Sequence, residues 1–286
     1  MVLNKLIHIA NLDSFRLNFL SYIIGNIFFA LNPIILNNYN KLIEKENKNF
    51  KISIDALEEI ETLVSLTTIA YIKKEICLPK IDKELSLNIE NMKHPLLQEK
   101  KCISNSFNSN KDINIITGSN MSGKTSFMRT IGINLVLAYI GTFVNAQEFT
   151  CPIMKIFTSI NVKDDIKKGI STFYGELKRI KNILDHDKEK EIPLIIFIDE
   201  IFKGTNYNDR IFGAKEVLKK LASLNCIVFL TTHDFELCEI KEKKINNYHF
   251  EEFYKENKIY FDYKIKQGKC NTTNAKYLMR KMKIID

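Results

Sequence analysis

The stretch TGSNMSGKTS, residues 117–126, decides the expected fold, because it fits the pattern G-x-x-x-x-G-K-[ST] of phosphate-binding loops. Gly118 and Gly123 have no Cβ, so backbone amides can approach phosphate oxygens closely. The pattern predicts that Lys124 reaches the β- and γ-phosphates of a nucleotide and that Thr125 is a ligand of Mg²⁺. The predicted nucleotide-binding residues of this loop are Gly118, Ser119, Asn120, Met121, Ser122, Gly123, Lys124, Thr125 and Ser126.

The segments on either side of the loop supply the context that the motif requires. INIIT (113–117) is a short apolar strand that runs directly into the loop, and residues 126–141 have the pattern of the helix that follows it. Two more apolar strands are predicted at 193–199 and 226–232. Fully apolar strands separated by helices favour an α/β fold whose mostly parallel central sheet is covered on both faces. The alternative interpretation of residues 117–126 is that a glycine-containing turn matches the phosphate-loop pattern by chance.

Polar residues end both of these later strands. Asp199 and Glu200 end the stretch LIIFIDE (194–200), and His233 follows the strand ending in TT. The carboxyl ends of parallel strands meet at one edge of a sheet, so Asp199 is expected beside the metal. Glu200 is then placed to position a water for attack on the γ-phosphate, and His233 to sense that phosphate. Alone, a strand ending in Asp-Glu is more often a polar turn and a histidine at a strand end is more often structural, but the co-location of both with the loop favours a catalytic role.

Residues 169–184, GISTFYGELKRIKNIL, predict a helix with one apolar face. Ser171 lies at its first turn, where free backbone amides favour an anion. One nucleotide does not need a second anion site in the same chain. A dimer would need it, if each subunit lent this turn to the nucleotide of the other.

The N-terminal region reads as helical up to residue 78, and the patch SNSFNSNKD (104–112) reads as turns. The apolar run 17–36 is long enough to span a bilayer, but asparagines and a proline interrupt it, which favours a buried helix over a membrane span. Asn11 and Asp13 precede that run, so no signal peptide is expected.

The chain carries 42 basic and 34 acidic residues, and residues 241–286 hold 12 of the basic and 6 of the acidic ones. A basic tail suits a polyanion such as DNA, and a solvated lysine-rich surface is the plainer alternative. Six scattered cysteines form no C-x-x-C pair, which indicates a reducing, cytoplasmic compartment.

Four motifs in this order and spacing resemble the ATPase domain of the MutS family, which belongs to the ABC-type ATPases. They are the loop at 117–126, DDIKKGISTFYGEL, FIDEIFKGTN and TTHDFEL. The resemblance covers residues 82–286, which it implies form a MutS-like P-loop ATPase domain. Residues 1–81 resemble the end of the helical lever that leads into that domain.

Carried over residue by residue, the resemblance implies that Lys124, Thr125 and Asp199 bind Mg²⁺ and ATP, with Thr125 and Asp199 at the metal. It implies that Glu200 is the catalytic carboxylate, assisted by His233 and Lys124. Ser171 matches the serine that reaches the nucleotide of the partner subunit, so a homodimer is expected. The expected function is an ATP-hydrolysing, DNA-binding protein of mismatch repair or recombination.

The chain departs from mismatch readers of this family in two places. Its N-terminal region has no Phe-x-Glu, the motif that wedges beside a mispair, and Cys102 stands where an aromatic residue often stacks on adenine. The alternatives are a nucleotide-binding module that acts through a protein or membrane partner, and a different ABC-type ATPase that clamps other cargo.

Overall fold

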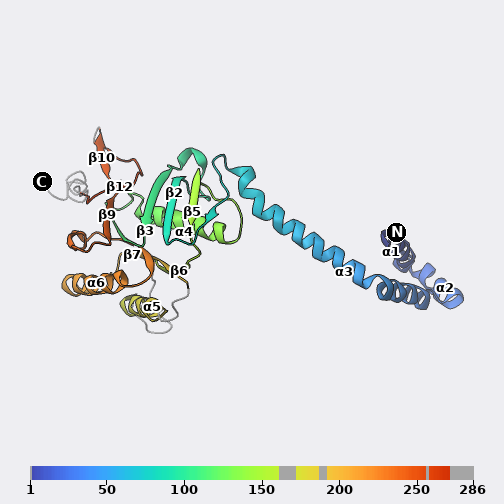
Figure 1. Cartoon of the computed structure of the whole chain (residues 1–286). Helices are drawn as coiled ribbons and strands as arrows, with labels where there is room; N and C mark the ends of the chain where they lie inside the picture. Colours follow the sequence, from blue (N-terminus) through green and yellow to red (C-terminus); the bar gives the residue numbers. More distant parts are fainter. Residues whose placement is uncertain (1, 161–171, 187–191, 256–257, 271–286) are drawn as a thin grey trace. The chain divides into compact units, whose positions relative to one another are not determined.

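A computed structural model of the chain describes residues 2–160, 172–186, 192–255 and 258–270 (Figure 1). The chain divides into two compact units, Met1–Leu66 and Thr67–Asp286. The division expected after residue 81 came from the family resemblance rather than from contacts, and it stays a prediction.

The described residues of the first unit are helical except at Asn18 and Ala30. Its elements are α1 (Val2–Asp13), the 3-10 turn η1 (Ser14–Leu17), α2 (Phe19–Phe29) and α3 (Leu31–Ile72), which continues into the second unit. Asn18 caps α2 by accepting from the amide of Leu20, and Ala30 ends it in the left-handed conformation with φ 46°.

The bend between α2 and α3 is held by polar side chains. Asn26 Oδ1 accepts from the amide of Asn32 at 2.9 Å, and the side-chain amide of Asn32 donates to the Tyr22 hydroxyl at 2.9 Å. These two asparagines therefore satisfy each other's hydrogen-bonding groups across the bend, which explains how polar side chains are tolerated within an apolar run.

The apolar run 17–36 is mostly exposed, so the expectation of a buried helix is wrong for this chain taken alone. No residue of α2 is buried, and within the described part of the run only Ile35 is. In the described residues no single helix has the length and hydropathy of a membrane span. The helices Phe19–Phe29 and Leu31–Glu44 together have the length and the apolar composition of a membrane span, but the pair is bent by 81°.

The second unit is built on a six-stranded sheet, which confirms the expected α/β class. In sheet order its strands are β12 (Lys266–Gln267), β9 (Ile245–His249), β4 (Ile113–Thr117), β8 (Cys226–Thr231), β7 (Leu194–Asp199) and β6 (Lys155–Ser159). All neighbours are parallel except β12 and β9. Every residue of β4 and β8 is buried, because both faces of these central strands are covered.

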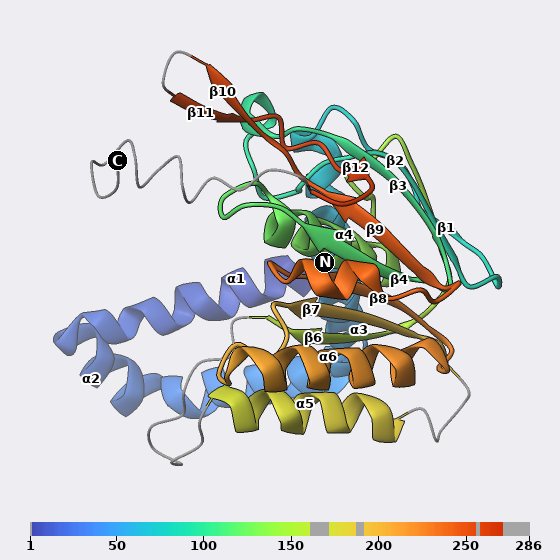
Figure 2. The same cartoon turned by 90° about the vertical axis from the view of Figure 1, so that its left-hand side faces the viewer.

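Two different layers cover this sheet, as Figure 2 shows. On one face lie α5 (Thr172–His186) and α6 (Tyr207–Ala222). On the other lie α4 (Lys124–Tyr139) and a second sheet of four strands. The strands of that second sheet are, in order, β1 (Lys80–Ile81), β5 (Glu148–Cys151), β2 (Ser86–Met92) and β3 (Asn105–Asn110).

The patch 104–112 is mainly a strand, which corrects the prediction of turns. In β3 the alternate residues Asn105, Phe107 and Ser109 are buried. The ring of Phe107 lies 5.6 Å from that of Phe127 on α4 and 5.2 Å from that of Phe229 on β8. Antiparallel pairing with β2 and one buried aromatic therefore outweigh the turn propensity of asparagine and serine.

The remaining described elements are short. They are η2 (Glu99–Lys101), η5 (Phe235–Glu239) and the antiparallel pair β10 (Glu252–Lys255) and β11 (Lys258–Phe261).

Candidate functional site

The loop 118–123 joins the carboxyl end of β4 to the first residue of α4, as the sequence pattern predicts. Gly118 has φ 144°, and a Cβ at this position would lie 2.8 Å from the carbonyl oxygen of Phe250. Gly123 caps α4 with φ 110°. Both positions thus require glycine, and the amino end of a sixteen-residue helix opens onto the loop.

Lys124 is buried inside this loop. Its Nζ donates to the carbonyl oxygens of Gly118 at 2.7 Å and Ser119 at 2.8 Å. Burial lowers the pKa of Lys124, and the negative charges of Glu200 and Asp199 oppose that change. The structure therefore brings the predicted lysine and the two predicted carboxylates into one electrostatic environment.

Two serine hydroxyls of the loop are buried without a hydrogen-bond partner among the described residues. They are Ser119 Oγ and Ser122 Oγ. Buried hydroxyls are nearly always hydrogen-bonded in native proteins, so this pair is arranged for a polar ligand. With the Lys124 ammonium and the amides at the amino end of α4, the loop can hold a phosphate group.

Asp199 connects three elements at the edge of the sheet. Its Oδ1 accepts from the hydroxyl of Thr125 on α4 at 3.0 Å and from that of Thr231 on β8 at 2.6 Å. Sequence reasoning named Asp199 and Thr125 but missed Thr231, although Thr231 lies in the TTHD motif. A hydroxyl beside a carboxylate suits Mg²⁺, which uses few protein ligands together with phosphate oxygens. No cluster of three or more His, Cys, Asp or Glu side chains suited to a metal occurs in the described residues.

Glu200, His233 and Asn120 form a second polar group beside the loop. The Nε2 atom of His233 lies 3.0 Å from Asn120 Oδ1 and 3.3 Å from Glu200 Oε1. Glu200 has φ 55°, a left-handed conformation that is uncommon for glutamate and recurs at functional sites. Hydrogen bonds from His233 and Lys203 lower the pKa of Glu200 to about 2, so Glu200 is a carboxylate at neutral pH.

Two of the predicted site residues, Met121 and Ser126, stand apart from these contacts. Ser171 lies outside the described residues. Met121 is 84% exposed with φ 68°, so its side chain points away from the loop it belongs to. Ser126 is exposed and lines a neighbouring cavity instead.

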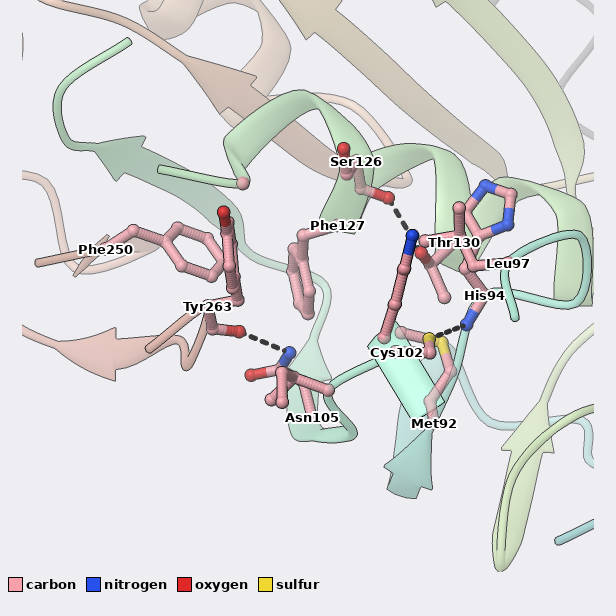
Figure 3. Close-up of a pocket in the computed structure, with 13 residues that line it drawn as sticks. Met92, His94, Leu97, Cys102, Asn105, Ser126, Phe127, Thr130, Phe250 and Tyr263 are labelled. Carbon is pink, nitrogen blue, oxygen red and sulfur yellow. Dashed lines mark hydrogen bonds between the residues drawn. The ribbon is translucent and has the colours of Figure 1, made fainter. Parts of the chain in front are cut away.

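That cavity, of about 430 Å³, lies at the start of α4 (Figure 3). Tyr263 and Phe250 line one side, and His94 and Cys102 line the other. The side chain of Asn105 donates to the carbonyl oxygen of Tyr263 at 2.9 Å and accepts from the amide of Ile265 at 2.8 Å. Sequence reasoning noticed Cys102 but missed Tyr263, whose ring would lie 3.2 Å from a Cβ on Gly123.

The fold and site define the class of this protein: a mixed α/β domain with a mostly parallel sheet and a polar site at its carboxyl edge. Residues 114–282, more than half of the chain, match the family described as MutS domain V. The chain belongs to the MutS domain V family.

Two relatives show how far the likeness extends. The DNA mismatch repair protein MutS of Leptospira interrogans is 33% identical over 257 residues, which cover 85% of this chain and 30% of the relative. The DNA mismatch repair protein MutS of Clostridioides difficile is 33% identical over 233 residues, covering 78% and 23% respectively. The chain thus matches less than a third of the length of these relatives.

Proposed function

We propose that this protein binds and hydrolyses ATP with Mg²⁺ at the loop 118–123, as a P-loop ATPase of the ABC type. The observation that carries the proposal is the pair of buried hydroxyls of Ser119 and Ser122 beside the Lys124 ammonium, which have no hydrogen-bond partner among the described residues. Phosphates would satisfy these hydroxyls and replace the carbonyl partners of Lys124. The cavity at the start of α4 is large enough for the nucleoside end of ATP.

The catalytic roles follow from charge. Thr125 and Asp199 would hold Mg²⁺, which neutralises negative charge on the phosphates. Because the pKa of Glu200 is about 2, its carboxylate is a weak base, better suited to orienting a water than to holding its proton. His233 contacts both Glu200 and Asn120, so it would fix the position of the Glu200 carboxylate relative to the loop.

Glu200→Gln tests this assignment. The amide keeps the shape of the side chain but loses the charge that orients water, so hydrolysis should fall about a hundredfold or more while ATP still binds. The measurements are steady-state phosphate release and equilibrium binding of a fluorescent ATP analogue. Glu61→Gln, an exposed position of α3, is the matched control. Hydrolysis at the parent rate in Glu200→Gln would assign the role to another residue.

We also propose that hydrolysis occurs at composite sites of a homodimer, with Ser171 reaching the nucleotide of the partner subunit. The support is the motif GISTFYGEL within the family match. Ser171→Arg should keep ATP binding at its own loop and suppress hydrolysis. Mixing Ser171→Arg with Lys124→Ala should restore one working site in each mixed dimer. A mixture as inactive as either variant alone would contradict the composite site.

A role in DNA repair is the third part of the proposal, supported by the relatives named as mismatch repair proteins. We expect DNA binding that is mostly electrostatic, because residues 241–286 carry an excess of basic side chains. Affinity for matched and mismatched duplexes should be similar and should fall steeply with salt. A large preference for the mismatched duplex, or no binding at low salt, would contradict this.

One observation favours a second candidate, a nucleotide-binding module that acts through a partner surface. Phe19, Ile27 and Phe28 on α2 are 76%, 71% and 74% exposed. Exposed apolar groups of this size commonly mark an interaction surface. Sedimentation velocity and flotation with phosphatidylglycerol vesicles, each with Phe28→Ser as the comparison, test this candidate. Unchanged behaviour of Phe28→Ser in both would remove it.

A further inference from the structure

A bidentate ion pair lies directly behind His233. Arg210, in the first turn of α6, donates from Nε to Asp234 Oδ2 at 2.9 Å and from an NH₂ group to Asp234 Oδ1 at 2.9 Å. The two side chains are 25% and 13% exposed. Two parallel charge-assisted hydrogen bonds in a largely buried setting fix the orientation of the guanidinium relative to the carboxylate as well as the distance between them. An exposed lysine pair does not fix the orientation in this way.

Each partner of this pair is itself held by the fold. Asn206 caps α6 by accepting from the amide of Asp209 at 3.0 Å, which fixes the turn that carries Arg210. The amide of Asp234 donates to Thr232 Oγ1 at 3.0 Å, and the amide of Thr232 donates to the carbonyl of Ile116 on β4 at 3.1 Å. The segment 232–234 is therefore tied on one side to the strand that carries the loop and on the other to α6.

His233 sits between these two anchors but is itself more weakly restrained. Its side chain is 39% exposed, and it contacts Asn120 and Glu200. A side chain so exposed needs its backbone fixed to hold such contacts, because surface polar bonds alone stabilise little. The neighbouring residue Asp234 supplies that restraint through Arg210.

A small cavity joins the ion pair to the catalytic group. It has a volume of about 140 Å³, room for a few water molecules at roughly 30 Å³ each. Its lining residues are Glu200, Ile201, Lys203, Arg210, Thr232, His233 and Asp234. The guanidinium thus faces the same space as the carboxylate that we assign to water orientation.

We propose that Arg210 is a positioning residue, which acts through Asp234 to fix His233 against Glu200 and Asn120. The effect on turnover rests on the proposed ATP hydrolysis, whereas the effect on His233 exists in the protein without nucleotide. The exposed ion pair that Lys219 forms with Glu216 on the same helix, at 2.7 Å, serves as the control.

The first measurement does not depend on ATP. In protein with isotope-labelled histidines, the ring resonances of His233 are assigned by their loss in His233→Gln. Arg210→Ala and Asp234→Asn should shift these resonances, Arg210→Lys should shift them less, and Lys219→Ala should leave them in place. Unshifted His233 resonances in a folded Arg210→Ala protein would overturn the proposal.

The second measurement separates positioning from general stability. Arg210→Ala should lower kcat by about 10- to 100-fold, because small displacements of a catalytic group have effects of that size. The KM for ATP should stay within about twofold, since the substitution leaves Lys124 and Thr125, which we propose bind the phosphates and Mg²⁺, unchanged. The exchanged pair Arg210→Asp with Asp234→Arg should recover part of the kcat and of the His233 spectrum. An Arg210→Ala protein with the kcat of the parent, or with a loss confined to KM, would also overturn the positioning role.

If the parent itself lacks ATPase activity, the proposed function fails while the His233 spectrum still decides the positioning role.

Discussion

Apolar runs of similar composition are buried in the second unit of this chain and exposed in the first. Phe229 in the second unit is fully buried, with its ring 5.4 Å from that of Phe197 and 5.2 Å from that of Phe107. Phe28 in the first unit is 74% exposed. Both lie in runs without charged side chains. The difference shows that an apolar run becomes a core only where other elements of the fold cover it.

The physical reason lies in the kind of element. Strands of the six-stranded sheet are paired with segments distant in sequence, and each face of the sheet receives a separate layer. Helices α2 and α3 satisfy their backbone hydrogen bonds internally, so they form without any such partner. Of the described side chains on these two helices only Ile35 and Leu42 are buried, although the backbone is regular.

The largest expected effect sharpens this contrast through stability. Phe229→Ala should lower the free energy of unfolding by about 3–5 kcal/mol, because it opens a cavity among packed rings. Phe28→Ala, the same change in the first unit, should alter it by less than about 0.5 kcal/mol. Urea unfolding followed by circular dichroism measures both. Equal losses would show that the first unit is packed in solution.

The next effect concerns charge at the nucleotide loop. Lys124→Ala should weaken ATP binding by about 1.5–3 kcal/mol, or roughly 10- to 150-fold, because it removes charged hydrogen bonds to phosphate. Lys51→Ala, an exposed lysine of α3, is the control and should not change affinity. Isothermal titration calorimetry at fixed Mg²⁺ compares the two. Unchanged affinity in Lys124→Ala would place the nucleotide elsewhere.

A smaller effect depends on pH. The folded protein lowers the pKa of Glu200 from 4.5 to about 2, so its ionised form contributes stability that is fully present above about pH 4.5. That contribution is lost as pH falls toward 2. The advantage of the parent over Glu200→Gln in urea unfolding should therefore be largest near neutral pH and shrink between pH 4.5 and 2. Exposed Glu58→Gln is the control. A difference independent of pH would contradict the assigned shift.

The smallest effect tests the cavity at the start of α4. Tyr263→Ala should weaken ATP binding by about 0.5–1.5 kcal/mol, the usual contribution of an aromatic contact, and Tyr263→Phe should keep most of the affinity. Tyr39→Ala, an exposed tyrosine of the first unit, should have no effect. Should Tyr263→Ala bind ATP as the parent does, the base lies outside this cavity.

Much of the candidate site could be predicted because its geometry is local. The strand, loop and helix from Ile113 to Tyr139 follow from a contiguous pattern, and the structure places them as expected within two residues at the helix start. The meeting of Asp199 with Thr125 follows from a general rule about parallel strand ends. The buried strands were evident because residues apolar on both faces are needed when both faces are covered.

Other features depend on contacts that no local pattern announces. The hydrogen bond between Asn105 and Tyr263 joins residues that are 158 positions apart in the sequence. The Arg210–Asp234 ion pair joins two residues that are 24 positions apart. β3 is a strand because β2 and the aromatic cluster around Phe107 hold it, although its composition predicts turns. The apolar run at 17–36 pointed to burial, yet α2 is exposed.

The amino-acid sequence by itself therefore determined the α/β class, the loop at 118–123 and the strand-end carboxylates, because these rest on backbone conformation and hydrophobic periodicity over short stretches. Only the tertiary structure decided which side chains complete the site. Thr231 and Arg210 reach it because the parallel sheet brings distant strand and helix ends to one edge. Tyr263, between β11 and β12, reaches it through its hydrogen bond with Asn105 on β3. Burial is decided at that level too, since it is a property of the neighbours of a side chain and not of the side chain alone.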